Sequence, residues 1–203
     1  MKNTDSARTA ENPRCRQQGV TCMPYERPDW DSYFMTIAAV AATRSTCLRR
    51  QVGAVIVRDG QIISTGYNGS PKGTPHCAET GCLRARLHIP SGERQEICRG
   101  SHAEMNAIAQ AASVGVSTAG ASLYCTHSPC AFCTKAIINA GIRRVVYLYS
   151  YPDELAEHLR EEAGLICGQF PHENLQKIFR CLDLVRAQLD RDAELKKGEC
   201  SCC

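Results

Sequence analysis

The sequence predicts an α/β fold, a three-layer α/β/α sandwich around a central mixed sheet. Two observations support this prediction: strand-like and helix-like periods alternate along the chain, and a strand hairpin precedes a strand–helix–strand unit. A hairpin makes an antiparallel pair and a strand–helix–strand unit makes a parallel one, so the sheet is expected to be mixed. With 203 residues, of which 43% are hydrophobic, the chain suits one core and is short for two full-sized domains.

The chain divides into three expected regions. Residues 1–27 show no hydrophobic period and are expected to form a mobile N-terminal leader. Residues 28–170 contain most of the predicted elements and form the expected main domain, with a cysteine-bearing insertion at 70–100. Residues 171–203 are expected to form a C-terminal helix followed by a cysteine-rich tail.

The first part of the main domain is expected to hold a helix and a hairpin. Asp29 can cap a helix that runs through Arg44, because apolar residues recur there at helical spacing (Phe34, Ile37, Ala38 and Ala41). The β-branched run Val52–Val57 and the segment Ile62–Tyr67 are typical of strands. An Asp-Gly pair lies between these two segments, which indicates a tight hairpin turn.

The second part begins with a long segment without a period. Prolines and glycines interrupt every pattern from Ser70 to Gly100, so the ordering of this loop needs a cause of its own. The elements expected after it are, in order, a helix from Ala103 to Ser113, a strand from Ser122 to Thr126, a helix from Pro129 to Ala140, a strand from Arg143 to Tyr149, a short helix ending at Ala163, a strand from Leu165 to Phe170 and an amphipathic helix from Glu173 to Lys196.

Composition limits the partners and the compartment. The formal net charge is only +3 and aromatic residues make up 6% of the chain, which argues against polynucleotide binding. The sequence contains neither a signal-peptide pattern nor a stretch of membrane-spanning length, so we expect no membrane contact and a cytoplasmic protein. In a reducing compartment, the fourteen cysteines favour metal ligation over disulfides.

Two predicted helix starts carry residues suited to metal chemistry. Cys130 and Cys133 are three residues apart, so both sulfurs lie on one face of a helix and can bind one zinc ion. The free N–H groups at a helix start also favour the thiolate form that a metal requires. His102, at the start of the preceding helix, is the expected third ligand.

A zinc ion with three protein ligands keeps one tetrahedral position for water, which separates a catalytic site from a closed structural one. Zinc lowers the pKa of such a water to about 7. Glu104 lies two residues beyond His102 and is expected to take the proton from this water and deliver it to the substrate, without binding the metal.

Each of these motifs also fits a simpler interpretation. Ser101 and Glu104 match a capping box, in which the glutamate only accepts a backbone hydrogen bond. Cys130 and Cys133 alone fit half of a closed zinc site or a redox pair. The conjunction of both motifs, each at a helix start, favours the catalytic interpretation.

The two motifs together form the pattern H-x-E followed by P-C-x-x-C, which resembles the cytidine deaminase superfamily. The resemblance covers about residues 30–151. Within the superfamily the chain is most similar to the deoxycytidylate (dCMP) deaminases, bacterial competence-operon members included. The segments that carry this similarity are Cys47, Val52–Val57, Ser64–Pro71, His102–Ile108, Cys125–Cys133 and Lys135–Ile138.

The resemblance implies hydrolysis of dCMP to dUMP and ammonia. It further implies that Asn68 helps to position the sugar or base and makes Lys72 a candidate for the 5′-phosphate. Tyr149 and Tyr151, at the end of the last expected core strand, could approach the site. The simpler interpretations are a left-handed turn residue for Asn68, a solvated surface charge for Lys72 and residues at the edge of the core for the two tyrosines.

The resemblance also implies a second, structural zinc. Four cysteines are expected to surround it, with His76 or His88 able to replace one of them (Cys47, Cys77, Cys82 and Cys98). Such an ion would tether the Gly- and Pro-rich insertion; the alternative is that these thiols are buried or unpaired. A homohexamer, activated by dCTP with Mg²⁺ and inhibited by dTTP, is implied as well.

Other functions stay open at this point. The same chemistry could act on another cytosine nucleotide, on a base in tRNA or single-stranded DNA, or on a free nucleoside. A zinc-stabilised regulatory protein without turnover is an alternative of a different class. The sequence does not decide the effector response, the number of subunits or the role of the C-terminal cysteines.

Overall fold

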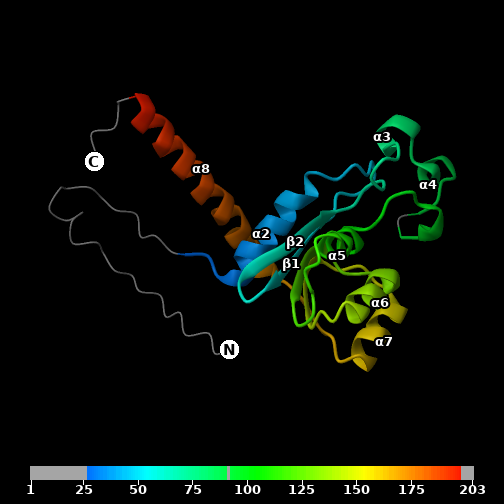
Figure 1. The fold of residues 1–203 in the computed structure, drawn as a ribbon. Coiled ribbons are helices and arrows are strands. Elements are labelled where there is room, and N and C mark those ends of the chain that lie inside the picture. The colour runs from blue at the N-terminus through cyan, green and yellow to red at the C-terminus, as the bar shows by residue number, and fades with distance from the viewer. Residues whose placement is uncertain (1–26, 91, 198–203) are drawn as a thin grey trace.

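A computed structural model describes residues 27–90 and 92–197 of the chain. Its centre is a five-stranded sheet in the order β2-β1-β3-β4-β5 (Figure 1). The strands are β1 Gly53–Arg58, β2 Gln61–Tyr67, β3 Ser122–His127, β4 Arg144–Tyr149 and β5 Ile166–Gln169. The helices are α2 Trp30–Ala42, α3 Cys77–Thr80, α4 Leu83–Arg86, α5 Ala103–Ser113, α6 Ala131–Asn139, α7 Glu154–Glu162 and α8 Leu175–Lys197, with short 3₁₀ turns at Gln95–Ile97 and His172–Asn174.

The sheet is mixed, as the sequence predicted. β1 pairs antiparallel with β2 and β3, whereas β3, β4 and β5 run parallel to one another. The β1–β2 hairpin turns at Asp59 and Gly60, both with positive φ (52° and 74°), which is the backbone that a two-residue hairpin requires. The parallel strands are joined by α6 and α7, because a parallel connection must cross back over the sheet.

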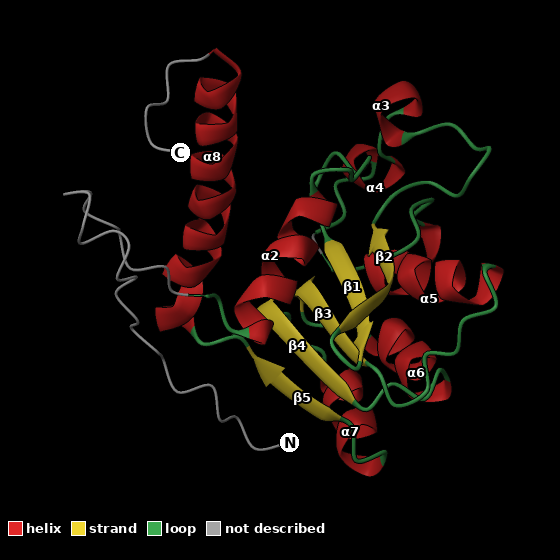
Figure 2. Cartoon of the chain, turned by 60° about the vertical axis from the view of Figure 1, so that its left-hand side comes forward, coloured by secondary structure: helices red, strands yellow, loops and turns green. Residues whose placement is uncertain are grey.

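Helices cover both faces of the sheet, which confirms the three-layer prediction (Figure 2). Alternate residues of β1 divide between two cores: Val55 packs in a cluster with Phe34 of α2, and Ile56 packs in a cluster with Ala107 of α5 and Ile137 of α6. The first turns of α8 join the α2 side through Ile178. The period of two along each strand therefore assigns its side chains to the two layers.

Two glycines bring helices directly onto the sheet. A Cβ atom at Gly53 would lie 2.0 Å from the carbonyl oxygen of Ala38 in α2. A Cβ atom at Gly66 would lie 2.2 Å from the carbonyl oxygen of Ala103, the first residue of α5. The start of α5 is thus fixed against β2, and this contact positions the site described below.

The observed boundaries differ from the predicted ones at a few places. α2 ends at Ala42 instead of Arg44, and α6 begins at Ala131 instead of Pro129, because Cys130 is its extended N-cap (φ −72°, ψ 173°). The short helices α3 and α4 lie in the segment predicted to be irregular, since a single turn is too short to show a hydrophobic period. The predicted leader and the cysteine-rich end of the tail fall almost entirely outside the described residues.

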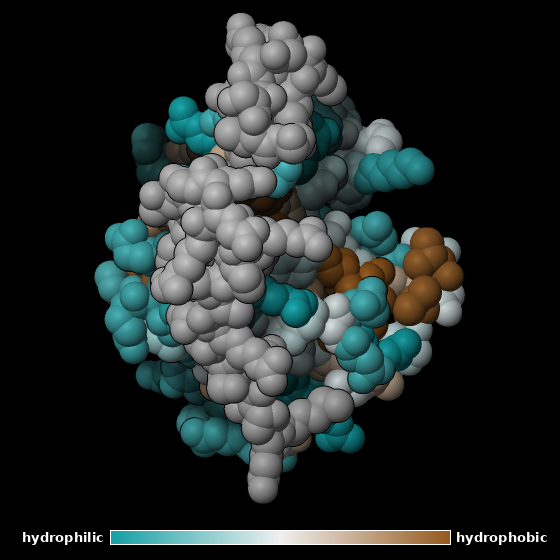
Figure 3. All heavy atoms as spheres, turned by 90° about the vertical axis from the view of Figure 1, so that its left-hand side faces the viewer, coloured by the Kyte–Doolittle hydropathy of each residue, from teal (hydrophilic) through white to brown (hydrophobic). Residues whose placement is uncertain are grey.

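No helix in the described ranges is both long enough and apolar enough to cross a membrane. Apolar side chains do remain exposed on one face of α8, and hydrophobic residues are visible between hydrophilic ones in the surface view of Figure 3. The exposed side chains of α8 are Phe179, Leu182, Val185 and Leu189.

Candidate active site

The N-terminal ends of α5 and α6 meet at one end of the sheet. α6 follows β3 directly, whereas the insertion separates α5 from β2 in the sequence. A β-bridge closes the base of the insertion: the N–H of Gly69 donates to the carbonyl of Ser101 (3.1 Å), and the N–H of Ser101 donates back to Gly69 (2.8 Å). The bridge brings the two ends of the insertion together, so α5 begins beside the end of β2 although residues 68–102 separate the two elements in the sequence.

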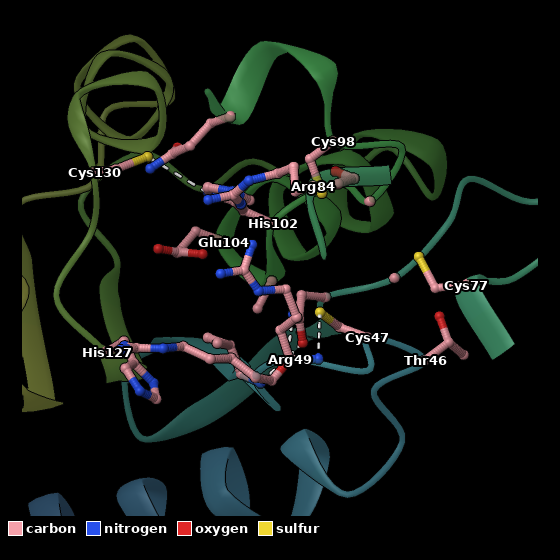
Figure 4. Close-up of a pocket in the computed structure, with 18 of the residues that line it drawn as sticks. Thr46, Cys47, Arg49, Cys77, Arg84, Cys98, His102, Glu104, His127 and Cys130 are labelled. Atoms are coloured by element: carbon pink, nitrogen blue, oxygen red, sulfur yellow. Dashed lines mark hydrogen bonds between the residues drawn. The ribbon is translucent and has the colours of Figure 1, made fainter. Parts of the chain in front are cut away.

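Three predicted metal ligands come together at these helix starts. His102 is the N-cap of α5, Cys130 is the N-cap of α6 and Cys133 lies in the first turn of α6. His102 Nδ1 lies 3.5 Å from the sulfur of Cys130 (Figure 4) and 3.3 Å from that of Cys133, and the three ligand atoms lie within 4.8 Å of one another. Tetrahedral zinc with ordinary Zn–N and Zn–S bonds needs ligand atoms roughly 3.5 Å apart, so these residues fit zinc.

The three predicted ligands differ in how readily they lose a proton. The pKa of Cys130 falls to about 4, because its thiolate accepts hydrogen bonds from Cys133 and His102. The hydrogen bond between the two cysteines raises the pKa of Cys133 well above its ordinary value. The hydrogen bond between His102 and Cys130 raises the pKa of His102. One thiolate is thus favoured without any metal, and a divalent cation would complete the deprotonation of the pair.

Glu104 is the second residue of α5 and belongs to the same pocket. Its side chain is only 4% exposed and lies beside His102. Burial raises the pKa of Glu104, against the opposing effect of the nearby His102. A buried carboxyl with a raised pKa is suited to exchange protons near neutral pH.

Three arginines line the pocket (Arg49, Arg50 and Arg84), and the sequence analysis named none of them as a site residue. Arg49, which precedes β1, donates to the carbonyl of Ile89 (3.0 Å), and Arg84 of α4 donates to the carbonyl of Pro90 (3.0 Å). Each also has a buried N–H, Arg49 Nη1 and Arg84 Nε, without a hydrogen-bond partner among the described residues. Buried cationic donors without acceptors favour an anionic ligand.

Asn68 lines the pocket, but its amide is occupied within the protein. Its Oδ1 accepts hydrogen bonds from Ser45 Oγ (2.6 Å) and the N–H of Val52 (2.9 Å), and its Nδ2 donates to the carbonyl of Arg50 (2.9 Å). Asn68 is not among the residues with positive φ, so it is not a left-handed turn residue. Its visible role is to fold the 45–52 loop, which carries Arg49 and Cys47, against the sheet.

The structure places the other two predicted substrate residues outside this pocket. Lys72 is exposed in the loop after β2 and is not among the lining residues. Tyr149 is 51% exposed, and its ring packs on that of His127, with the ring centroids 5.4 Å apart. The pocket lining does contain Tyr151, the second tyrosine expected to approach the site, together with His127.

The four cysteines of the predicted second site all line the same pocket (Cys47, Cys77, Cys82 and Cys98). They are not at ligand distance: among the residues described, only His102, Cys130 and Cys133 form such a group. Burial raises the pKa of Cys77, and the other three cysteines raise it further, so the four thiols do lie near one another. His76 and His88 are exposed and lie outside the lining residues.

The chain is an α/β/α sandwich in which two paired helix starts carry one histidine and two cysteines next to a buried glutamate. These features define the class of zinc-dependent nucleobase deaminases. The sequence matches the family described as the cytidine and deoxycytidylate deaminase zinc-binding region over residues 28–149. The chain belongs to this family.

Named relatives agree with this membership. ComE operon protein 2 of Bacillus subtilis is 47% identical over 145 residues, which cover 71% of this chain and 72% of that protein. The deoxycytidylate deaminase of Schizosaccharomyces pombe is 43% identical over 150 residues, 73% of this chain but only 46% of the yeast protein. A solved structure of the dCMP deaminase from cyanophage S-TIM5, in complex with dCMP and dUMP, is 28% identical with a TM-score of 0.60 and covers 72% of this chain and 100% of that one.

Proposed function

We propose that this chain hydrolyses dCMP to dUMP and ammonia, with a zinc ion held by His102, Cys130 and Cys133. The observation that carries the proposal is the meeting of these three ligand atoms within 4.8 Å, in a family whose zinc-binding region the chain shares. The relatives named deoxycytidylate deaminase, and the dCMP and dUMP in the cyanophage structure, support the choice of substrate.

When bound, zinc supplies a water of lowered pKa at its open position. The buried carboxyl of Glu104, in the same pocket as His102, would take a first proton from that water as the water oxygen adds to C4 of the cytosine ring, and would pass it to N3. Glu104 would then carry the second proton of the water, from the new C4 hydroxyl, to the departing amino group. The balance is one water consumed and one ammonia released, with the C4 oxygen of dUMP coming from water.

The 5′-phosphate is assigned to the two arginines rather than to Lys72. Arg49 and Arg84 line the pocket and carry buried N–H groups without acceptors among the described residues, whereas Lys72 lies outside it. A guanidinium can bind two phosphate oxygens at once, and such charge-assisted bonds are about twice as strong as neutral ones. Bidentate binding here would hold the nucleotide with its base toward Glu104.

The insertion is proposed to hold a second, structural zinc through Cys47, Cys77, Cys82 and Cys98. Their shared position on one pocket and the raised pKa of Cys77 support this proposal. Binding the ion would draw the four sulfurs together, because a closed tetrahedral site needs all four as thiolates around one centre. The insertion would thereby become ordered around Arg84.

Assembly and regulation complete the proposal. A homohexamer is supported by the exposed apolar side chains of α8, since exposed apolar surface favours association. Activation by dCTP with Mg²⁺ and inhibition by dTTP rest on the family resemblance. A cytoplasmic location is supported by the thiol ligands, which need a reducing compartment to stay unoxidised.

A nucleotide panel tests the proposal. The purified full chain, loaded with zinc, is given dCMP, CMP, dCTP, deoxycytidine and a short cytosine-containing oligonucleotide, each with and without dCTP and Mg²⁺ as effector. We expect ammonia and a uracil product mainly from dCMP. Turnover of the oligonucleotide alone would replace the proposed substrate by single-stranded DNA or RNA, and turnover of no compound would favour a regulatory protein.

A further inference from the structure

The segment that follows β4 holds the start of α6 through hydrogen bonds on both sides of Cys130. The carboxylate of Asp153 accepts the N–H of Ala131 at Oδ2 (2.8 Å), and Arg160 of α7 donates from Nη2 to the carbonyl of Pro129. Pro129 and Ala131 are the chain neighbours of Cys130. The backbone that carries this ligand is therefore fixed from outside its own helix.

Asp153 serves two helices at once. Its Oδ1 accepts the N–H of Ala156 (3.0 Å), so it is also the N-cap of α7. α6 has no such residue of its own, because its N-cap is Cys130, whose side chain makes no cap hydrogen bond. The free N–H at the first position of α6 therefore needs an acceptor from another element, and Asp153 supplies it.

Ser128 ties the same two segments together. Its N–H donates to the carbonyl of Tyr149 (2.8 Å), its Oγ accepts the N–H of Tyr151 (2.7 Å), and the hydroxyl donates to the carbonyl of Tyr151 (3.0 Å). Ser128 is buried. With Asp153 and Arg160, this forms a network of hydrogen bonds between residues 149–160 and residues 128–131.

We infer that Asp153 and Arg160 are positioning residues that keep Cys130 at metal-ligand distance from His102. The inference rests on the proposed zinc site. Free rotation of the chain at residues 129–131 would move the Cys130 sulfur away from His102, and both flanking peptide groups are held against such rotation. Residues that orient metal ligands in this way typically change metal affinity or activity by about 10-fold to 100-fold when they are replaced.

The test compares two N-cap aspartates in the full chain. Asp153→Ala removes the acceptor of both Ala131 and Ala156, whereas Asp29→Ala removes the N-cap of α2, which accepts the N–H of Ser32 (2.8 Å) and lies on the other side of the sheet. Zinc release to a chelator is measured for both variants. The kinetic phase of zinc release that belongs to this site is the one that is absent when release is measured for His102→Ala.

We expect Asp153→Ala to speed this phase by about 10-fold or more and Asp29→Ala to leave it unchanged, although both should lower the melting temperature. Asp153→Asn, which keeps one acceptor oxygen, should give an intermediate rate and remains testable if the alanine variant does not fold. Arg160→Met should speed the phase as well. Unchanged zinc release in Asp153→Ala, at the same loss of melting temperature as Asp29→Ala, would overturn the inference and leave Asp153 as an ordinary cap.

The readout is separate from turnover. A chain that shows this dependence of zinc release on Asp153 but forms no dUMP from dCMP would support the positioning role and contradict the proposed function. Cobalt substitution gives a second, spectroscopic measure: thiolate-to-cobalt absorption bands should shift in Asp153→Ala and stay unchanged in Asp29→Ala.

Discussion

The two sets of cysteines around the pocket differ in how the protein supports them. Cys130 and Cys133 lie at a helix start that packs in a core cluster with Ile137, and their sulfurs lie near His102 without a metal. Of the four cysteines of the proposed second site, three lie on or near single-turn helices of the insertion (Cys77, Cys82 and Cys98), and Cys77 is the only buried residue among those described there; Cys47 lies in the loop before β1. The fold brings the ligand atoms of the α5–α6 site together, whereas the four thiols of the proposed second site are not at ligand distance.

The two ions would therefore contribute differently to the molecule. At the α5–α6 site the packing of sheet and helices already orders the ligands, so the main contribution of the ion would be to activate a water for the reaction. In the insertion the ion would contribute folding energy, because the segment buries little apolar surface of its own.

The largest effect is expected at the α5–α6 site itself. Cys133→Ala removes a fully buried ligand, so the variant should lose the zinc of this site and at least about 10³-fold of its activity toward dCMP. Metal analysis and the rate of dUMP formation check this. Cys181→Ala is the matched control, because this buried cysteine lies on α8 outside the pocket lining, and it should keep both zinc and activity.

The next effect concerns the arginines. Arg84→Met keeps the length of the side chain but removes the charge, so the KM for dCMP should rise by about 10-fold to 100-fold with a smaller change in kcat. Deoxycytidine, which lacks the phosphate, should be turned over equally by both proteins. Lys72→Met is the control and should leave the KM for dCMP unchanged. A rise in this KM for Lys72→Met alone would show that Lys72, and not Arg84, binds the 5′-phosphate.

The insertion should respond through its order. Cys77→Ser is expected to make residues 70–100 roughly ten times or more faster to cleave in limited proteolysis, while the zinc of the α5–α6 site stays bound. Mass spectrometry of the fragments locates the cleavage. Equal cleavage of Cys77→Ser and the unmodified chain would show that these thiols do not order the insertion.

The smallest effect is on stability and depends on pH. Burial raises the pKa of Glu104 above its ordinary value of 4.5, so the metal-free folded chain keeps a proton that the unfolded chain loses. Its stability therefore falls as pH rises from 4.5 toward the raised pKa, each unit of elevation contributing about 1.4 kcal/mol. Glu104→Gln should be more stable than the unmodified chain at pH 8 and gain less at pH 5, as denaturant titrations can measure. Glu157→Gln, on the exposed face of α7, should show no such difference.

The parts of the fold and site that the sequence predicted are those encoded locally. α5 was predicted with its observed bounds, because its acidic first turn and its apolar period lie within a dozen residues, although its N-cap His102 makes no side-chain cap hydrogen bond. The meeting of His102 with Cys130 was predictable from the two motifs. The short helices of the insertion were not, since one turn carries no period.

The remaining features depend on contacts between distant segments. Arg49 reaches the pocket only because Asn68, far along the chain, folds the 45–52 loop back, and Arg84 reaches it through the insertion. Lys72 was a candidate only through the family resemblance, and it is exposed and outside the pocket lining. Asp153 lies in a region without a matching motif, and its role emerges only where β4 ends beside α6.

Deamination of dCMP by the zinc-loaded full chain, compared with Glu104→Gln at equal zinc content, tests the central claim most directly. We expect dUMP and ammonia in equal amounts from the unmodified chain. The rate of dUMP formation should be about 10²- to 10⁴-fold lower in the variant, with its zinc retained. A zinc-loaded chain that forms no dUMP, or a Glu104→Gln variant as active as the unmodified chain, would contradict it.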